Sequence, residues 1–165
     1  MPRRLAVPAA IVIAAAIGIW YFTRVSDDTA EVRRRLDALS AAVNASTTDG
    51  RGPAARANEF GSFFTDDVEI DLGTGTSPIR GRATLISMAE RLQPRTAAFK
   101  LKFEDVSVVV NPEGTQADVH LTAEFIRRDL VSGGESLDAR EFTLVVQRSS
   151  HGWQIRRVTA VDTLK

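Results

Sequence analysis

The hydrophobic positions of this chain follow three different patterns along its length. An unbroken apolar run without a charged residue extends from Leu5 to Phe22. A stripe at helical spacing follows between Val25 and Val43, and an alternation of apolar and polar residues begins at Phe99. These patterns predict a membrane-spanning helix, an amphipathic helix and a series of β-strands, in that order.

The apolar run is long enough to cross a bilayer as a helix. Its 18 residues rise by about 27 Å, close to the thickness of the hydrocarbon layer. Trp20 and Tyr21 close the run, as aromatic residues do at a membrane interface. A cleaved secretory signal is the alternative, but the run is longer than usual and no small-residue cleavage site follows Phe22. We therefore favour an uncleaved anchor.

The charges around the run set the expected orientation. Arg3 and Arg4 precede it, and acidic residues follow it from Asp27 onward. The positive-inside rule then places the N-terminus in the cytoplasm. The sequence predicts a single-pass protein of the cell (inner) membrane, with residues 1–24 as cytoplasmic tip and anchor and residues 25–165 as a periplasmic or extracellular domain.

The first helix of this domain is expected to begin near Asp28, which resembles a capping box together with Glu31. Its apolar stripe consists of Val25, Val32, Leu36, Leu39 and Val43. Three arginines, 33–35, fall mostly off the stripe. We interpret them as a solvated helix face, and contact with lipid head groups is the alternative.

Two further helices and a short strand are expected next. One helix begins at Pro53, a favourable first residue, and ends near residues 65–67. Its inward positions are Ala57, Phe60 and Phe64. A strand from Val68 to Leu72 follows, and a helix runs from about Arg82 to Leu92.

The remainder of the chain alternates like an antiparallel meander. The apolar parity of Phe99 and Leu101 changes after Asp105, where Val106 takes over, and such a change predicts a β-bulge. Turns are expected at 111–114, 132–134 and 149–152. Helices followed by strands predict an α+β fold, with three N-terminal helices packed on a strongly curved antiparallel sheet to form a cone, preceded by one transmembrane helix.

Composition narrows the function. Without Arg3, Arg4 and Arg24 the chain has 18 basic and 21 acidic residues, a net charge of −3, which argues against nucleic acid as a partner. The absence of cysteine from the sequence excludes disulfides and thiolate chemistry. His120 and His151 are the only imidazoles, so we predict neither a metal site nor a cofactor.

Three short motifs in a fixed order carry a resemblance to a known family. They are FFTDDVEID at 63–71, PIRGR at 78–82 and GWQI at 152–155 with Val158. Over roughly Val32 to Leu164 the chain resembles the nuclear-transport-factor-2-like (NTF2-like) superfamily, in its SnoaL-like and ketosteroid-isomerase-like branch. The resemblance implies a cone-shaped, cystatin-like fold, homodimers through the sheet, and an apolar pocket between sheet and helices.

The resemblance also indicates where an active site would lie. The general base of the isomerase-like enzymes corresponds to Leu72 here, and the neighbouring Asp71 should face the opposite side of the strand. Asp71 is therefore the one weak catalytic candidate. The expected pocket residues are Phe64, Leu72, Phe99, Leu101, Phe125, Phe142 and Trp153. His120, by its parity, should lie on the outer face, at the surface or in a dimer interface.

These observations favour a membrane-tethered binding or assembly domain without catalysis. Its partners would be the bilayer through Leu5 to Phe22, a second copy of the chain or a membrane complex, and a small apolar ligand. The alternative is a divergent isomerase or hydrolase that acts on a small apolar molecule with Asp71 as base. A scaffold for envelope assembly is a third hypothesis, based on analogy of fold alone.

Overall fold

The computed structural model describes residues 27–45, 52–73, 75–91, 97–129 and 133–161. The predicted anchor, Leu5 to Phe22, lies outside these residues. Val25, the first residue of the expected helical stripe, and Ser132, the first residue of an expected turn, also lie outside them. Within the described ranges, none of the helices has the length and apolarity that crossing a bilayer requires.

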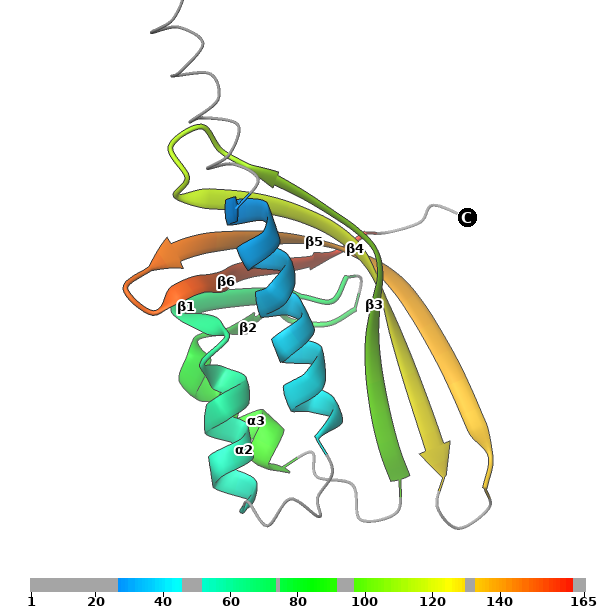
Figure 1. Cartoon of the computed structure of the whole chain (residues 1–165). Helices are drawn as coiled ribbons and strands as arrows, with labels where there is room; N and C mark the ends of the chain where they lie inside the picture. The colour runs from blue at the N-terminus through cyan, green and yellow to red at the C-terminus, as the bar shows by residue number, and fades with distance from the viewer. Residues whose placement is uncertain (1–26, 46–51, 74, 92–96, 130–132, 162–165) are drawn as a thin grey trace, which may run out of the picture.

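The described residues form three helices and six strands, and the α+β class predicted from the sequence is confirmed (Figure 1). A long helix covers residues 27–44. The other elements are α2 (Pro53–Gly61), β1 (Phe64–Asp71), β2 (Ile79–Arg80), α3 (Arg82–Arg91), β3 (Ala97–Val110), β4 (Gln116–Asp129), β5 (Glu135–Ser149) and β6 (Gly152–Ala160). The helices do not all precede the strands, because α3 follows β1 and β2.

The six strands form one sheet in the order β2-β1-β6-β5-β4-β3. Most neighbours in it are antiparallel, but β1 and β6 run parallel, with Ile70 beside Val158. The sheet is therefore mixed, and the prediction of a wholly antiparallel sheet is wrong. No hairpin joins β1 to β6, so local sequence does not fix their relative direction.

β3 bends at the point where the apolar alternation changes parity. The register with β4 shifts between Glu104 and Ser107, and Asp105 has a positive φ of 51°. Beyond the shift Val108 lies opposite Val119. The predicted bulge is confirmed, and Figure 1 shows the sheet curving around the 27–44 helix.

The 27–44 helix packs its apolar stripe on the concave face of this sheet. Its buried stripe residues are Val32, Leu36 and Leu39. Its last turn is tied to β3, because the Asn44 amide accepts from the Leu101 N–H at 2.6 Å and donates to the Leu101 carbonyl at 2.8 Å. β3 is an edge strand, so Asn44 satisfies backbone groups that lack a neighbouring strand.

One expectation about this helix needs correction, and a second is extended by further contacts. Residue 27 is already helical, so Asp28 lies inside the helix, and its buried carboxylate binds Arg148 of β5 instead of capping the helix. Arg33 and Arg35 also do more than face solvent. Arg33 donates to a backbone carbonyl of β3 at 2.6 Å, and Arg35 donates to the Ser62 carbonyl at 2.8 Å. Burial lowers the pKa of Arg35 from its usual value.

The first strand begins earlier than the sequence predicts. α2 ends at Gly61, and Phe64, expected in that helix, is the first residue of β1. The cause is a contact from the other end of the chain. The buried Gln154 amide of β6 donates to the carbonyls of Ser62 and Phe64, each at 3.1 Å, and so holds this segment against β6.

Candidate functional site

Exposure divides the seven residues predicted to line a ligand pocket into two groups. The buried group is Phe64, Leu101, Phe142 and Trp153. The exposed group is Leu72 at 42%, Phe99 at 49% and Phe125 at 41%. Large apolar side chains with this much exposure on the inner side of a sheet mark a candidate binding surface.

Phe99 and Phe125 lie on a three-stranded extension of the sheet, which we call the arm. The arm consists of residues 97–104, 122–129 and 135–141. Pairing between β5 and β6 ends at Phe142, so the arm has no strand beside β5 within the described residues. Figure 1 shows the arm curving past the C-terminal end of the 27–44 helix.

Aromatic side chains share the inner face of the arm. Phe125 pairs directly with Leu101, and directly paired residues of antiparallel strands lie on the same face. The Phe125 ring also packs edge-on against Phe142, with ring centroids 6.5 Å apart. Phe99 lies two residues before Leu101 and has the same parity. The inner face of the arm therefore carries an aromatic surface, formed by Phe99, Phe125 and Phe142.

Charged side chains that the sequence analysis missed lie on the same face. Arg127 directly opposes Phe99, and Asp138 directly opposes Phe125. Arg140, two residues further along β5, pairs loosely with Asp138, with 3.6 Å between Nε and Oδ2. Continuing the alternation past Phe125 would have identified Arg127, and tracing it back from Phe142 would have identified the other two.

Asp71, the weak catalytic candidate, lies near the end of β1. Val68 and Ile70 are buried and Asp71 is half-buried, and Leu72 continues the parity of the two buried residues. The Asp71 carboxylate accepts from the backbone N–H of Gly73 at 3.0 Å. Asp71 is thus held by the turn that follows it, on the opposite face of the strand from Val68 and Ile70.

The two histidines belong neither to the aromatic surface nor to the surroundings of Asp71. His120 is exposed and its Nδ1 lies 3.3 Å from the Thr143 hydroxyl. His151 lies in the turn between β5 and β6, where its Nδ1 is 3.1 Å from the Ser150 hydroxyl. Among the described residues, no group of histidine, cysteine or carboxylate side chains could hold a metal ion.

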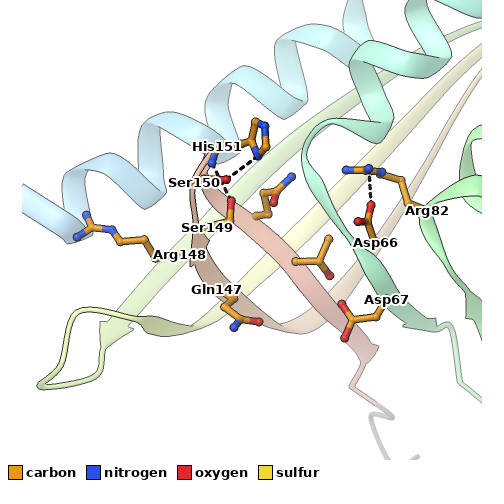
Figure 2. A pocket seen from close by; sticks show the side chains of 10 residues that line it. Asp66, Asp67, Arg82, Gln147, Arg148, Ser149, Ser150 and His151 are labelled. Carbon is orange, nitrogen blue, oxygen red and sulfur yellow. Dashed lines mark hydrogen bonds and ion pairs between the residues drawn. The ribbon is translucent and has the colours of Figure 1, made fainter.

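A polar hollow of about 400 Å³ lies between the start of β1, the start of α3 and the β5–β6 turn. Figure 2 shows Asp66 facing Arg82 across it and Arg148 pointing away toward the long helix. Asp67 pairs with Arg156 at 3.3 Å. The neighbouring Thr65 hydroxyl, and to a smaller degree Arg156, hold the pKa of Asp67 below its usual value. His151 also lines the hollow, and both of the carboxylates there have an arginine partner in an exposed pair.

The comparisons with known proteins agree with this architecture. The sequence profile of the SnoaL-like domain matches residues 24–159. A search of curated proteins gave no match.

Three similar solved structures come from Novosphingobium aromaticivorans. A protein provisionally named as a scytalone dehydratase has a TM-score of 0.70 at 13% identity, covering 87% of this chain and 89% of its own. A provisionally named aromatic ring hydroxylase has a TM-score of 0.66 at 18% identity, covering 84% and 91%. An NTF2-like protein with a cystatin-like fold has a TM-score of 0.64 at 16% identity, covering 92% and 90%.

Such low identities support a shared fold and no shared activity. The profile, in contrast, extends over most of the chain and includes all three sequence motifs. The chain therefore belongs to the SnoaL-like domain family, and it shares the fold of an NTF2-like protein.

Proposed function

We propose that this SnoaL-like domain binds a small apolar molecule on the aromatic surface of its arm. The observation that supports the proposal is the exposure of Phe99 and Phe125 on a face whose other end is buried. A ligand that covered these rings would remove apolar area from water, and full burial of one such side chain contributes about 1.5–3 kcal/mol. Ring-containing molecules suit this surface, because aromatic rings pack favourably edge-on or offset.

The binding test uses the full chain in a nonionic detergent and 2-naphthamide as a neutral, ring-containing probe. Isothermal titration calorimetry, corrected with empty micelles, should show saturable binding. Phe125→Ala should weaken it at least about fivefold, because one of the two exposed rings is lost. Leu137→Ala is the matched control, since Leu137 is 62% exposed on the outer face of the same arm. Equal losses in both variants, or no saturable binding, would contradict the proposal.

A second candidate function is acid–base catalysis on such a molecule, as a divergent isomerase or hydrolase with Asp71 as base. The enzyme names of two similar structures, a dehydratase and a hydroxylase, support it. Proton abstraction requires the base within hydrogen-bond reach of the bound molecule. The Asp71 carboxylate would have to leave the Gly73 N–H and turn to the inner face.

Exchange of the acidic protons of 2-tetralone in D₂O separates the two candidates. A catalytic base would accelerate the exchange above the buffer rate, and Asp71→Asn would abolish that acceleration. A domain that only binds would leave the exchange at the buffer rate, with and without the substitution. Glu69→Gln on the same face of β1 serves as the matched control.

The proposed location is the outer side of the cell membrane, with Leu5 to Phe22 as an uncleaved tether and a second copy or a membrane complex as partner. Support comes from the apolar run and its flanking charges. Protease added to intact spheroplasts should digest the domain, and alkaline carbonate should leave the chain in the membrane fraction. A protected domain or a carbonate-soluble chain would contradict this location. Crosslinking in the membrane would identify the partner.

A further inference from the structure

Charged side chains lie on both faces of the arm, and their pairing differs between the faces. On its inner face the described side chains include two arginines, Arg127 and Arg140, and one carboxylate, Asp138. On the outer face, Lys102 pairs with Glu104 within the arm. The inner face of the arm therefore carries two guanidinium groups among the described side chains.

Neither arginine forms a close, buried ion pair with another described side chain. The pair between Arg140 and Asp138 is long, 3.6 Å, and its side chains are 57% and 66% exposed. Exposed pairs of this kind contribute little to stability and exchange readily with solvent. Arg127 is exposed, and its direct neighbours across the strands are Phe99 and Ser136, which carry no charge. Both guanidinium groups are thus accessible to a ligand.

The spacing places these guanidinium groups next to the aromatic surface. Directly opposed residues such as Arg127 and Phe99 have Cβ atoms about 5 Å apart. Arg127 and Phe125 are two residues apart on one strand, a separation of about 7 Å. Arg140 opposes Ala123, on the other side of the Phe125–Asp138 pair from Arg127, so the two arginines flank Phe125 along the strands. A substituent at the edge of a fused ring system over Phe99 and Phe125 would therefore lie between these two side chains.

We propose that the ligand of the arm is an amphipathic anion, with a ring-containing apolar body and a carboxylate. The body covers Phe99 and Phe125, and the carboxylate pairs with Arg127 and Arg140. Arginine suits this role because its planar guanidinium donates two parallel hydrogen bonds to a carboxylate. This inference rests on the proposed function and adds the chemical class of the ligand to it.

Three probes with the same ring system and different charge test the inference on the full chain in nonionic detergent. They are 2-naphthoate, 2-naphthamide and 2-naphthylmethylammonium. Calorimetry should show 2-naphthoate binding about fivefold tighter than the amide, the scale expected for partly exposed charge pairs, and the ammonium binding weakest. Arg127→Gln and Arg140→Gln should each reduce the ratio of the affinities for 2-naphthoate and 2-naphthamide.

Two variants make the test specific. Arg128→Gln removes a charge from the adjacent position on the outer face and should leave the preference intact. Asp138→Asn should tighten 2-naphthoate about twofold, because it frees Arg140 and removes a repulsive carboxylate. Circular dichroism verifies that each variant is folded.

The outcomes separate the two proposals. Equal affinity for the three probes, still dependent on Phe125, would overturn the inference and leave the proposed function standing. A preference for 2-naphthoate that Arg128→Gln reduces as much as Arg127→Gln would also overturn it, since net charge alone would explain the result. Absence of binding for all three probes would overturn the proposed function and the inference with it.

Discussion

The concave face of this sheet has a closed end and an open end, although both are built from the same alternation. At the closed end, Leu144 and Val146 of β5 are buried, and so is Trp153 of β6. At the open end, Phe125 of β4 and Phe99 of β3 are nearly half exposed. The residues are equally apolar, so hydrophobicity does not explain the difference in exposure. The difference arises because the 27–44 helix packs over one end of the face and not over the other.

The lengths of the elements explain where the cover ends. A helix rises about 1.5 Å per residue, so the 18 residues at 27–44 cover about 27 Å. A strand rises about 3.3 Å per residue, so the 15 residues of β5 extend over nearly 50 Å. The strands are therefore longer than the helix that packs on their concave face. The arm is the part of these strands that extends beyond the helix.

The closed end is sealed by Arg148, which lies 120 positions from its main partner in the sequence. Its guanidinium lies 4.9 Å from the centre of the Trp153 ring and pairs with both Asp28 and Glu31 of the long helix. The chain thus uses a charged side chain to close one end of the face. At the other end, Arg127 and Arg140 have no such partner in the helix among the described contacts.

The largest expected effect lies at the closed end. Leu144→Ala should reduce the free energy of unfolding by about 3 kcal/mol, because it leaves a cavity in a packed region. Phe125→Ala, which removes more atoms, should reduce it by only about 1 kcal/mol, the edge-on ring contact with Phe142. Urea denaturation of the full chain followed by circular dichroism measures both. Equal losses would mean that the two ends are equally well packed.

Breaking the seal should have the next largest effect. Arg148→Met would leave the Asp28 carboxylate buried without its cation and should cost about 2–3 kcal/mol. The double variant Asp28→Asn with Arg148→Met should be more stable than Arg148→Met alone, since the carboxylate that remains without its cation, Glu31, is 44% exposed and not buried. A double variant that is less stable than Arg148→Met would show that Asp28 stabilises the fold through contacts other than its pair with Arg148.

The contact at the boundary between the two ends should have an intermediate effect. Asn44→Ala removes two hydrogen bonds to the Leu101 backbone and should cost about 1–2 kcal/mol. The Leu101 amide should also exchange faster with solvent deuterium, which hydrogen-exchange mass spectrometry measures on peptides of β3. Ser40→Ala, which removes one bond to the same carbonyl, is the milder control. Unchanged exchange would mean that Asn44 does not protect this edge.

The smallest expected effect concerns Asp67, outside both ends. Its pKa in the folded chain lies below the ordinary value of 3.8, so it stabilises the fold above that value, and the stabilisation disappears as the pH falls through the lower, folded pKa. Asp67→Asn should therefore narrow the difference between the urea midpoints at neutral pH and at about pH 3. Glu113→Gln in the exposed β3–β4 turn is the control. An equal narrowing in that control would assign the effect to net charge.

Local patterns in the sequence predicted much of the fold. The stripe of Val32, Leu36 and Leu39 identified the helix face that packs on the sheet, because helical spacing gathers these residues on one side. The parity change after Asp105 located the bulge, because one extra residue reverses every side chain that follows. The same alternation placed Asp71 opposite Val68 and Ile70 in β1.

The candidate site was predicted only in part. The apolar positions Phe99, Leu101 and Phe125 were identified as one set, but their division into exposed and buried members depends on where the helix ends above them. Arg127 and Arg140 were missed because the alternation was not followed into the charged ends of the strands. Charged residues at strand ends usually face solvent, so composition alone gives no reason to select them.

The sequence by itself determined the family, the helix and strand periods, the bulge and the expectation of an anchor. Only the tertiary structure decided that β1 lies parallel to β6, that Asp28 binds Arg148, and that the arm extends beyond its cover. The physical reason is the range of the interactions. Periodicity records which face of an element avoids water, whereas neighbours far apart in sequence are chosen by packing that no local pattern encodes.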